Sequence, residues 1–90
     1  MKGGDQMKET EVGKITHYYD HIGVGVVQVS KGIKIGDKIH IKGKANDFTQ
    51  EVTSMQVEHK QVDEAKKGDA VGMKVDQEAE ENDVVSKVEE

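Results

Sequence analysis

Apolar and polar residues alternate through the middle of the chain, on either side of two glycine-containing turns at residues 30–32 and 36–37. The residues from Asp37 to Lys42 keep a strict period of two. Such a period places successive side chains on opposite faces of an extended strand, so this segment is typical of a β-hairpin. We expect Ile39 and Ile41 to face the core, and Lys38, His40 and Lys42 to face solvent.

The same pattern extends to most of the chain. Short apolar segments are separated by glycine-containing turns, and no segment shows the stripe of an amphipathic helix. The segment 31–36 is expected to be a short crossing and 43–49 a loop. Short strands at regular spacing favour a closed barrel, which leaves no exposed sheet edge. The expected fold is therefore all-β, a small closed six-stranded antiparallel β-barrel, with strands at 12–19, 23–29, 37–42, 50–58, 70–75 and 82–88.

The expected organisation is one domain with short ends. Residues 1–11 are polar, carry two adjacent glycines and show no period, so they are expected to form a flexible leader. The barrel is expected to span residues 12–88, and residues 89–90 to form a C-terminal tail. Ninety residues with one third apolar side chains and three aromatic ones require a core of Val, Ile and Met.

Charge and cysteine content narrow the class of protein. The net charge is −5: residues 76–90 carry −6, with seven acids and one lysine, and residues 1–75 carry +1. The chain has no cysteine, which excludes disulfides and thiolate catalysis. No apolar run approaches the ~20 residues of a membrane span. The expected location is the cytoplasm, without contact to a membrane.

One basic stretch is the strongest candidate for a binding site. Residues 31–44 carry five lysines against a single acid, Asp37, for a local charge of +4. Lys38, His40 and Lys42 share one outward strand face, where they would form a row of cations about 6.6–7 Å apart that could follow a phosphate backbone. The other interpretation is a solvated face that lysine keeps soluble. The candidate nucleic-acid-binding residues are Lys31, Lys34, Lys38, His40, Lys42 and Lys44.

Other side chains carry weaker signals. His17 and His21 with Asp20 resemble a metal pair, but they span a strand end and a turn, so no ligand set is expected. Tyr18 and Tyr19 should face opposite sides of their strand, one in the core and one exposed. No motif combines a nucleophile, a base and an orienting group, so the sequence predicts no enzyme, no cofactor and no metal.

The order of the motifs resembles a known family. The parts are a glycine-containing strand at 23–29, a crossing at 33–35, a Gly-Asp turn with an alternating strand at 36–41, a strand with spaced apolar residues at 50–57, an acidic-alanine turn at 62–65, and a Gly-Asp-Ala-Val-Gly strand at 68–72. This order is similar to that of the second domain of translational GTPases such as elongation factor Tu. The resemblance implies a barrel that contacts the ribosome, ribosomal RNA or tRNA. The same barrel is also attached to unrelated enzymes such as collagenase-like peptidases, where the resemblance implies docking.

Two functions therefore stay open at this point. The chain lacks the glycine-rich loop that holds nucleotide phosphates, so nucleotide binding is not expected. The first function is a translation-factor-like module that binds RNA or the ribosome through its lysine face. The second is an adaptor that docks on a partner protein and has no nucleic-acid role.

Overall fold

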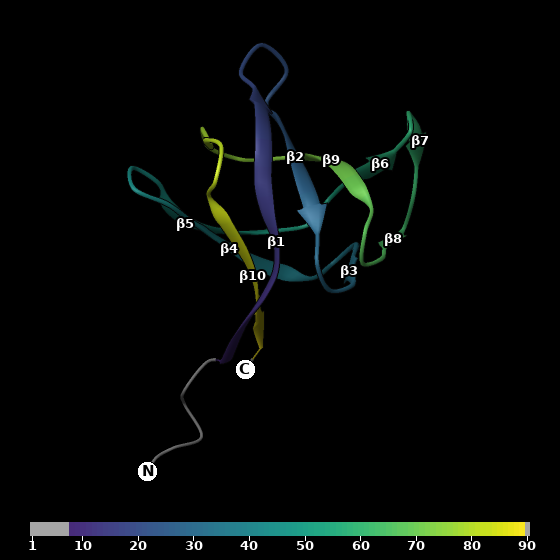
Figure 1. The fold of residues 1–90 in the computed structure, drawn as a ribbon, viewed down its shortest axis with the longest axis horizontal. Helices are drawn as coiled ribbons and strands as arrows, with labels where there is room; N and C mark the ends of the chain where they lie inside the picture. The colour runs from purple at the N-terminus through teal and green to yellow at the C-terminus, as the bar shows by residue number, and fades with distance from the viewer. Residues whose placement is uncertain (1–7, 90) are drawn as a thin grey trace.

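Antiparallel strands make up every regular element of the computed structural model, which describes residues 8–89. Within this range the chain contains no helix, and accordingly none that could span a membrane. The strands form one eight-stranded sheet and one two-stranded sheet (Figure 1). The ten strands are β1 (Lys8–Tyr19), β2 (Val24–Val29), β3 (Ile33–Lys34), β4 (Lys38–Lys42), β5 (Asp47–Glu51), β6 (Met55–Val57), β7 (Lys60–Gln61), β8 (Glu64–Ala65), β9 (Ala70–Lys74) and β10 (Val84–Glu89).

The order of strands in the large sheet is β5-β4-β10-β1-β2-β9-β6-β7. The expected all-β antiparallel class is confirmed. The closed ring of six strands is not confirmed, because the hydrogen-bonded order has two ends, at β5 and β7. The small sheet pairs β3 with β8 and lies inside the segments expected to be a crossing and a turn.

Alternating apolar side chains form the core. Ile39 and Ile41 on β4 are fully buried, as their period predicts, and β2 contributes Val27 and Val29. The buried set also includes methionines at positions where a straight, flexible side chain fills irregular space. The largest fully buried apolar side chains are Ile15, Ile33, Ile39, Ile41, Met55, Met73, Val12, Val27, Val52, Val71 and Val85.

Two irregularities in β1 decide which side chains face outward. The pairing of β1 with β10 shifts between Glu11 and Gly13, and its pairing with β2 shifts between Ile15 and His17. Each shift inserts one extra residue, as in a β-bulge. The extra residue in the β1–β2 pair lies on β1, and Val24 and Val26 of β2 are half-buried on the outer face.

Several boundaries differ from the expected ones. Strand β1 begins at Lys8, inside the segment expected to be a leader, while residues 1–7 and 90 lie outside the described residues. Strand β5 begins at Asp47, inside the expected 43–49 loop. The strand expected at 50–58 is divided between β5 and β6 by residues 52–54. Strand β10 begins at Val84 rather than at residue 82.

Polar side chains connect parts of the fold that the strand ladder does not. Gln50 is buried on β5; its side-chain nitrogen donates to the Lys74 carbonyl at 2.9 Å, and its oxygen accepts from the Asp76 backbone N–H at 2.7 Å. Gln50 thereby ties the edge strand β5 to the end of β9. A polar residue at this inward position is satisfied by these two bonds, which removes the cost of burying it.

Candidate functional site

The outward face of β4 carries the expected row of Lys38, His40 and Lys42. The two lysines are exposed and His40 is partly covered. The neighbouring strand β5 places an acid opposite each lysine, because Lys38 pairs with Glu51 and Lys42 pairs with Asp47 in the strand register. Directly opposed side chains in an antiparallel pair have Cβ atoms about 4.5–5.5 Å apart, close enough for opposite charges to attract. The row is therefore a mixed-charge surface rather than a free line of cations.

The other candidate lysines lie on separate elements. Lys31 lies in the turn after β2, Lys34 on β3 opposite Glu64, and Lys44 in the loop between β4 and β5. All three are exposed. The six candidate residues thus lie on four elements, and the local charge of +4 is distributed over them.

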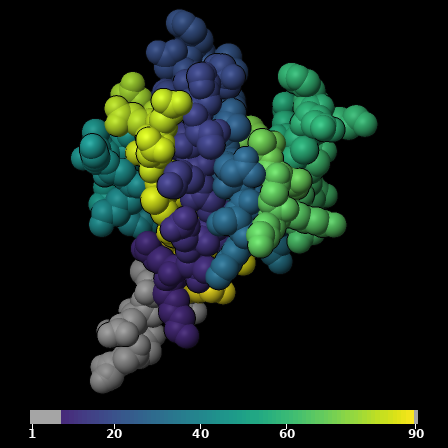
Figure 2. Space-filling model, in the orientation of Figure 1, coloured from purple at the N-terminus to yellow at the C-terminus, as the bar shows by residue number. Residues whose placement is uncertain are grey.

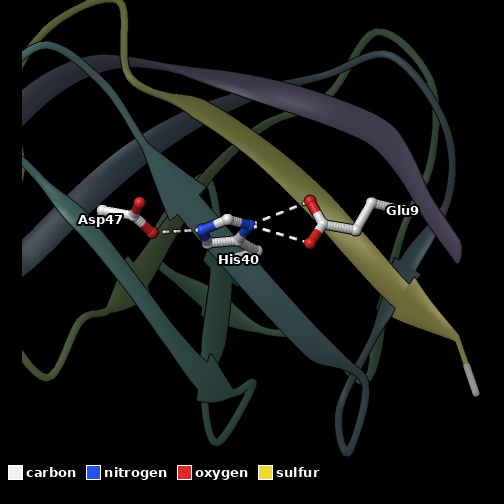
Figure 3. Close-up of polar contacts among 3 residues, drawn as sticks. All are labelled: Glu9, His40 and Asp47. Atoms are coloured by element: carbon white, nitrogen blue, oxygen red, sulfur yellow. Dashed lines mark hydrogen bonds and ion pairs between the residues drawn. The ribbon is translucent and has the colours of Figure 1, made fainter. Parts of the chain in front are cut away.

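His40 lies between two carboxylates, as Figure 3 shows. Its Nδ1 atom is 2.9 and 3.0 Å from the two carboxylate oxygens of Glu9, and its Nε2 atom is 2.5 Å from an oxygen of Asp47. Glu9 comes from β1 and Asp47 from β5, so the imidazole links strands on both sides of β4. The His40 side chain is 15% exposed.

Both ring nitrogens of His40 face atoms that only accept hydrogen bonds, an arrangement that the doubly protonated imidazolium satisfies. The hydrogen bond to Asp47, followed by the one to Glu9, raises the pKa of His40 above its ordinary value of 6.5. The same bond to His40 lowers the pKa of Asp47 below its ordinary value of 3.8. We call the three residues Glu9, His40 and Asp47 the histidine clamp.

Sequence reasoning missed the two acids of the histidine clamp. Glu9 belongs to the segment expected to be a leader, and it is 31 positions from His40. Asp47 belongs to the segment expected to be a loop. A local count of charge over residues 31–44 ends before Asp47 and therefore finds no acid on this face.

The remaining candidates show no reactive arrangement. His21 and Asp20 form an exposed pair, with Nε2 and Oδ1 3.8 Å apart. Within residues 8–89, no group of three or more His, Cys, Asp or Glu side chains is placed to hold a metal ion. Tyr18 packs against the core and Tyr19 is exposed, as expected, and the rings of His17 and Tyr19 lie 4.3 Å apart.

Asp83 is a buried acid whose carboxylate holds two loops together. Its Oδ2 atom accepts from the Asn46 side chain and from the Glu80 backbone N–H, each at 2.9 Å. It connects the loop after β4 with the loop before β10. Gly43 lies directly against its carboxylate.

An apolar groove lies between the β1–β2 hairpin and the β6–β7 hairpin. Figure 2 shows the surface hollowed between these two projections. Half-buried Val24 and Val26 line it together with Ala70 and Gly72. Residues 8–89 have three exposed large apolar side chains, Tyr19, Ile22 and Ile35, and the first two border this groove.

Comparison with known proteins identifies one relative in sequence. No protein-family model matches the chain. Over 79 residues, or 87% of its length, the chain is 38% identical to an uncharacterized protease of Methanocaldococcus jannaschii. It spans 19%, about one fifth, of that relative.

Two solved structures share the fold. They are crystal structures of the C-terminal domain of a U32 peptidase of Geobacillus thermoleovorans, one of them a selenomethionine variant. The TM-scores are 0.82 and, for the variant, 0.80, at 22% sequence identity. The match covers 91% and 95% of those domains and 87% and 83% of this chain.

These similarities correct the expected family and function. In fold, the chain resembles the C-terminal domain of a U32 peptidase, and in sequence it resembles part of a protease. The assignment to the second domain of translational GTPases is therefore wrong. The translation-factor function through RNA or the ribosome is withdrawn with it. Glycine-aspartate turns followed by alternating strands encode a type of fold, and such turns recur in unrelated proteins.

Proposed function

We propose that this chain is a non-catalytic accessory domain that packs against a U32-type peptidase catalytic region. The observation that carries the proposal is the fold match, because it covers nearly the whole of a domain that is C-terminal in a U32 peptidase. The 38% identity to part of a longer protease supports it. In such an assembly the catalytic groups belong to the partner region.

The surroundings of His40 support a role without catalysis. Ser86 pairs with His40 in the strand register and Asp47 binds its Nε2 atom, a set that superficially resembles a hydrolytic triad. A general base needs a free nitrogen toward the serine, but Nδ1 is engaged by Glu9. The imidazole is held as an ion-pair partner, which does not suit it to accept a proton.

The groove beside the β1–β2 hairpin is the surface that we assign to the catalytic region. Ile22 is 67% exposed and Tyr19 is 48% exposed, and they lie next to Val24 and Val26. Adjacent exposed apolar side chains of this size are typical of contact surfaces. Gly72 also lines the groove, and a Cβ atom there would meet Val24 at 3.5 Å, an ordinary van der Waals contact.

A binding measurement tests the function. The probe is the Methanocaldococcus jannaschii relative without its matched segment, mixed with this chain and analysed by calorimetry and gel filtration. We expect a complex, and we expect Ile22→Glu to weaken it at least about tenfold, since burying an unpaired charge is costly. Ile35→Glu is the matched control, because Ile35 is 38% exposed and lies outside the groove.

Two outcomes would count against this function. The absence of a complex, or equal losses in the two variants, would remove the groove as the contact surface. Hydrolysis of gelatin or casein by the purified chain alone, lost in a His40→Gln variant, would overturn the non-catalytic role.

We also propose that residues 47–57 close the sheet into a barrel of six strands. Strand β5 pairs with β4, strand β6 pairs with β9, and residues 52–54 join the two. The hydrogen bonds of Gln50 to residues 74 and 76 bridge the position where this continuous segment passes from one neighbour to the other. Slow exchange of the backbone amides throughout 48–57 would support closure, and fast exchange across 52–57 would contradict it.

A further inference from the structure

We propose that the histidine clamp is a pH-sensitive latch: protonated His40 holds residues 8–11 of β1 in place, and loss of its proton releases them. This conformational device is independent of the proposed function. It rests on the positions of Glu9, His40 and Asp47 on three different strands.

Proton counting gives the latch its two states. The imidazolium donates one N–H to Glu9 and one to Asp47. A neutral imidazole has a single N–H, so one of its nitrogens would turn a lone pair toward a carboxylate. One of the two contacts must therefore break when His40 loses its proton.

The contact with Glu9 is the one that gives way. Asp47 lies on β5, which pairs with β4 along its whole length and is tied on its other side to residues 74 and 76 by the side chain of Gln50. The contact of Asp47 with His40 is also the shorter one. Residues 8–11 pair with β10 alone, because the pairing of β1 with β2 begins at Gly13. A strand end held on one side opens at lower free energy than one held on both.

The charged groups around His40 favour the protonated state of its imidazole. On β1, Glu11 pairs with Ser86, which in turn pairs with His40, and so adds a second acid to this side. On β4 and β5, Lys38 and Lys42 oppose a cation at His40, but they face Glu51 and Asp47. On β10 the facing residue is the uncharged Ser86, and the Lys87 ammonium lies 3.7 Å from Asp37.

Release would uncover part of a neighbouring strand. Strand β10 is paired with β4 through residues 84–87 and with β1 through residues 84–89. When residues 8–11 leave, the backbone groups of 86–89 that face β1 lose their partners. The latch therefore controls whether this edge is available for pairing.

Nuclear magnetic resonance tests the latch on the intact chain. The titration of each histidine ring is followed together with amide exchange of residues 8–11, corrected for intrinsic rates, between about pH 5.5 and 8.5. We expect His40 to titrate above the ordinary histidine pKa of 6.5. Protection of residues 8–11 should fall about three- to tenfold as His40 loses its proton, the loss of one charge-assisted hydrogen bond at a partly exposed position.

Variants separate the latch from general stability. In His40→Gln the protection of residues 8–11 should be low and independent of pH, whereas His21→Gln should behave like the parent chain. Glu9→Gln removes the carboxylate that binds Nδ1 of His40. Because the Glu9 side chain is 43% exposed, this variant should fold and can replace His40→Gln in the test if that variant does not fold. Protection that does not change with pH, or a His40 titration at or below 6.5, would overturn the proposal.

Discussion

The carboxylate of Asp83 occupies the space that a side chain at Gly43 would need. A Cβ atom at Gly43 would lie 1.7 Å from Oδ1 of Asp83 and 2.6 Å from its Cγ. Asp83 cannot move away freely, because it is 2% exposed and is held by Asn46 and by the backbone of Glu80. The close approach joins the loop after β4 to the loop before β10.

Gly43→Ala should destabilise the fold by about 2–4 kcal/mol, because the new methyl group displaces a buried, hydrogen-bonded acid. Urea unfolding followed by circular dichroism measures the change. Gly32→Ala is the control, since a Cβ there would meet its nearest neighbour at an ordinary 3.6 Å. Equal stability of the two variants would contradict the close approach.

Gln50→Ala should lower the free energy of unfolding by about 2–4 kcal/mol. The substitution removes two hydrogen bonds and leaves the Lys74 carbonyl and the Asp76 N–H without their partner. Gln28→Ala, at an exposed position of β2, should change it by less than about 1 kcal/mol. A loss no larger at Gln50 than at Gln28 would show that the bridge does not stabilise the sheet.

Stability should depend on pH through the histidine clamp. The folded pKa of His40 is raised, so its contribution is complete below 6.5 and is lost as pH rises through the folded value. The folded pKa of Asp47 is lowered, so its contribution is present above 3.8 and is lost as pH falls through the folded value. Urea midpoints measured across this range should therefore be highest between the two ordinary values and fall on either side.

His40→Gln should flatten the alkaline side of this pH profile, and Asp47→Asn should flatten its acidic side. His21→Gln should leave the profile unchanged. If the urea midpoint of His40→Gln falls as steeply above pH 6.5 as that of the parent chain, the histidine clamp is not the cause of the pH dependence.

The two-residue turn of the β6–β7 hairpin offers a stabilising substitution. Glu58 and His59 both have positive φ angles, 53° and 67°, a conformation that a primed hairpin turn requires and that an Asn-Gly pair adopts more readily. The double substitution Glu58→Asn with His59→Gly should raise the free energy of unfolding by about 1 kcal/mol. Differential scanning calorimetry would detect the higher Tm, and an unchanged or lower value would contradict the strain.

Lys38→Glu should destabilise the chain by about 0.5–1 kcal/mol, because it places two acids opposite each other at Glu51. The exchanged pair Lys38→Glu with Glu51→Lys should recover most of this loss. A double-mutant cycle with urea unfolding gives the coupling, and a value near zero would mean that the opposed charges do not interact.

The sequence predicted much of the strand pattern, because burial alternates where apolar residues alternate. The period of Ile39 and Ile41 identified the inward face of β4 correctly. Strand β5 began earlier than expected because its inward positions hold Phe48 and the polar Gln50, so a single apolar residue marks the strand. No feature of the sequence around Gln50 indicates that its side chain forms hydrogen bonds to the backbone at residues 74 and 76.

The candidate site was harder to predict, since its electrostatics depend on pairing between distant segments. The lysines of β4 were correctly placed outward, but the opposing acids come from β5 and from the first residues of β1. The family was misassigned for a related reason: turn and strand motifs determine the fold, and the function depends on surfaces that those motifs do not specify.

The extra residue at Val12 has a consequence for the histidine clamp. Side chains along a strand alternate between faces, so adding one residue reverses the parity of every position before it. With the insertion, Glu9 and Glu11 share the face of His40; an uninterrupted strand would turn both acids to the opposite face. A one-residue deletion at position 12 would thus abolish the ion pair while leaving all three of its side chains in the chain.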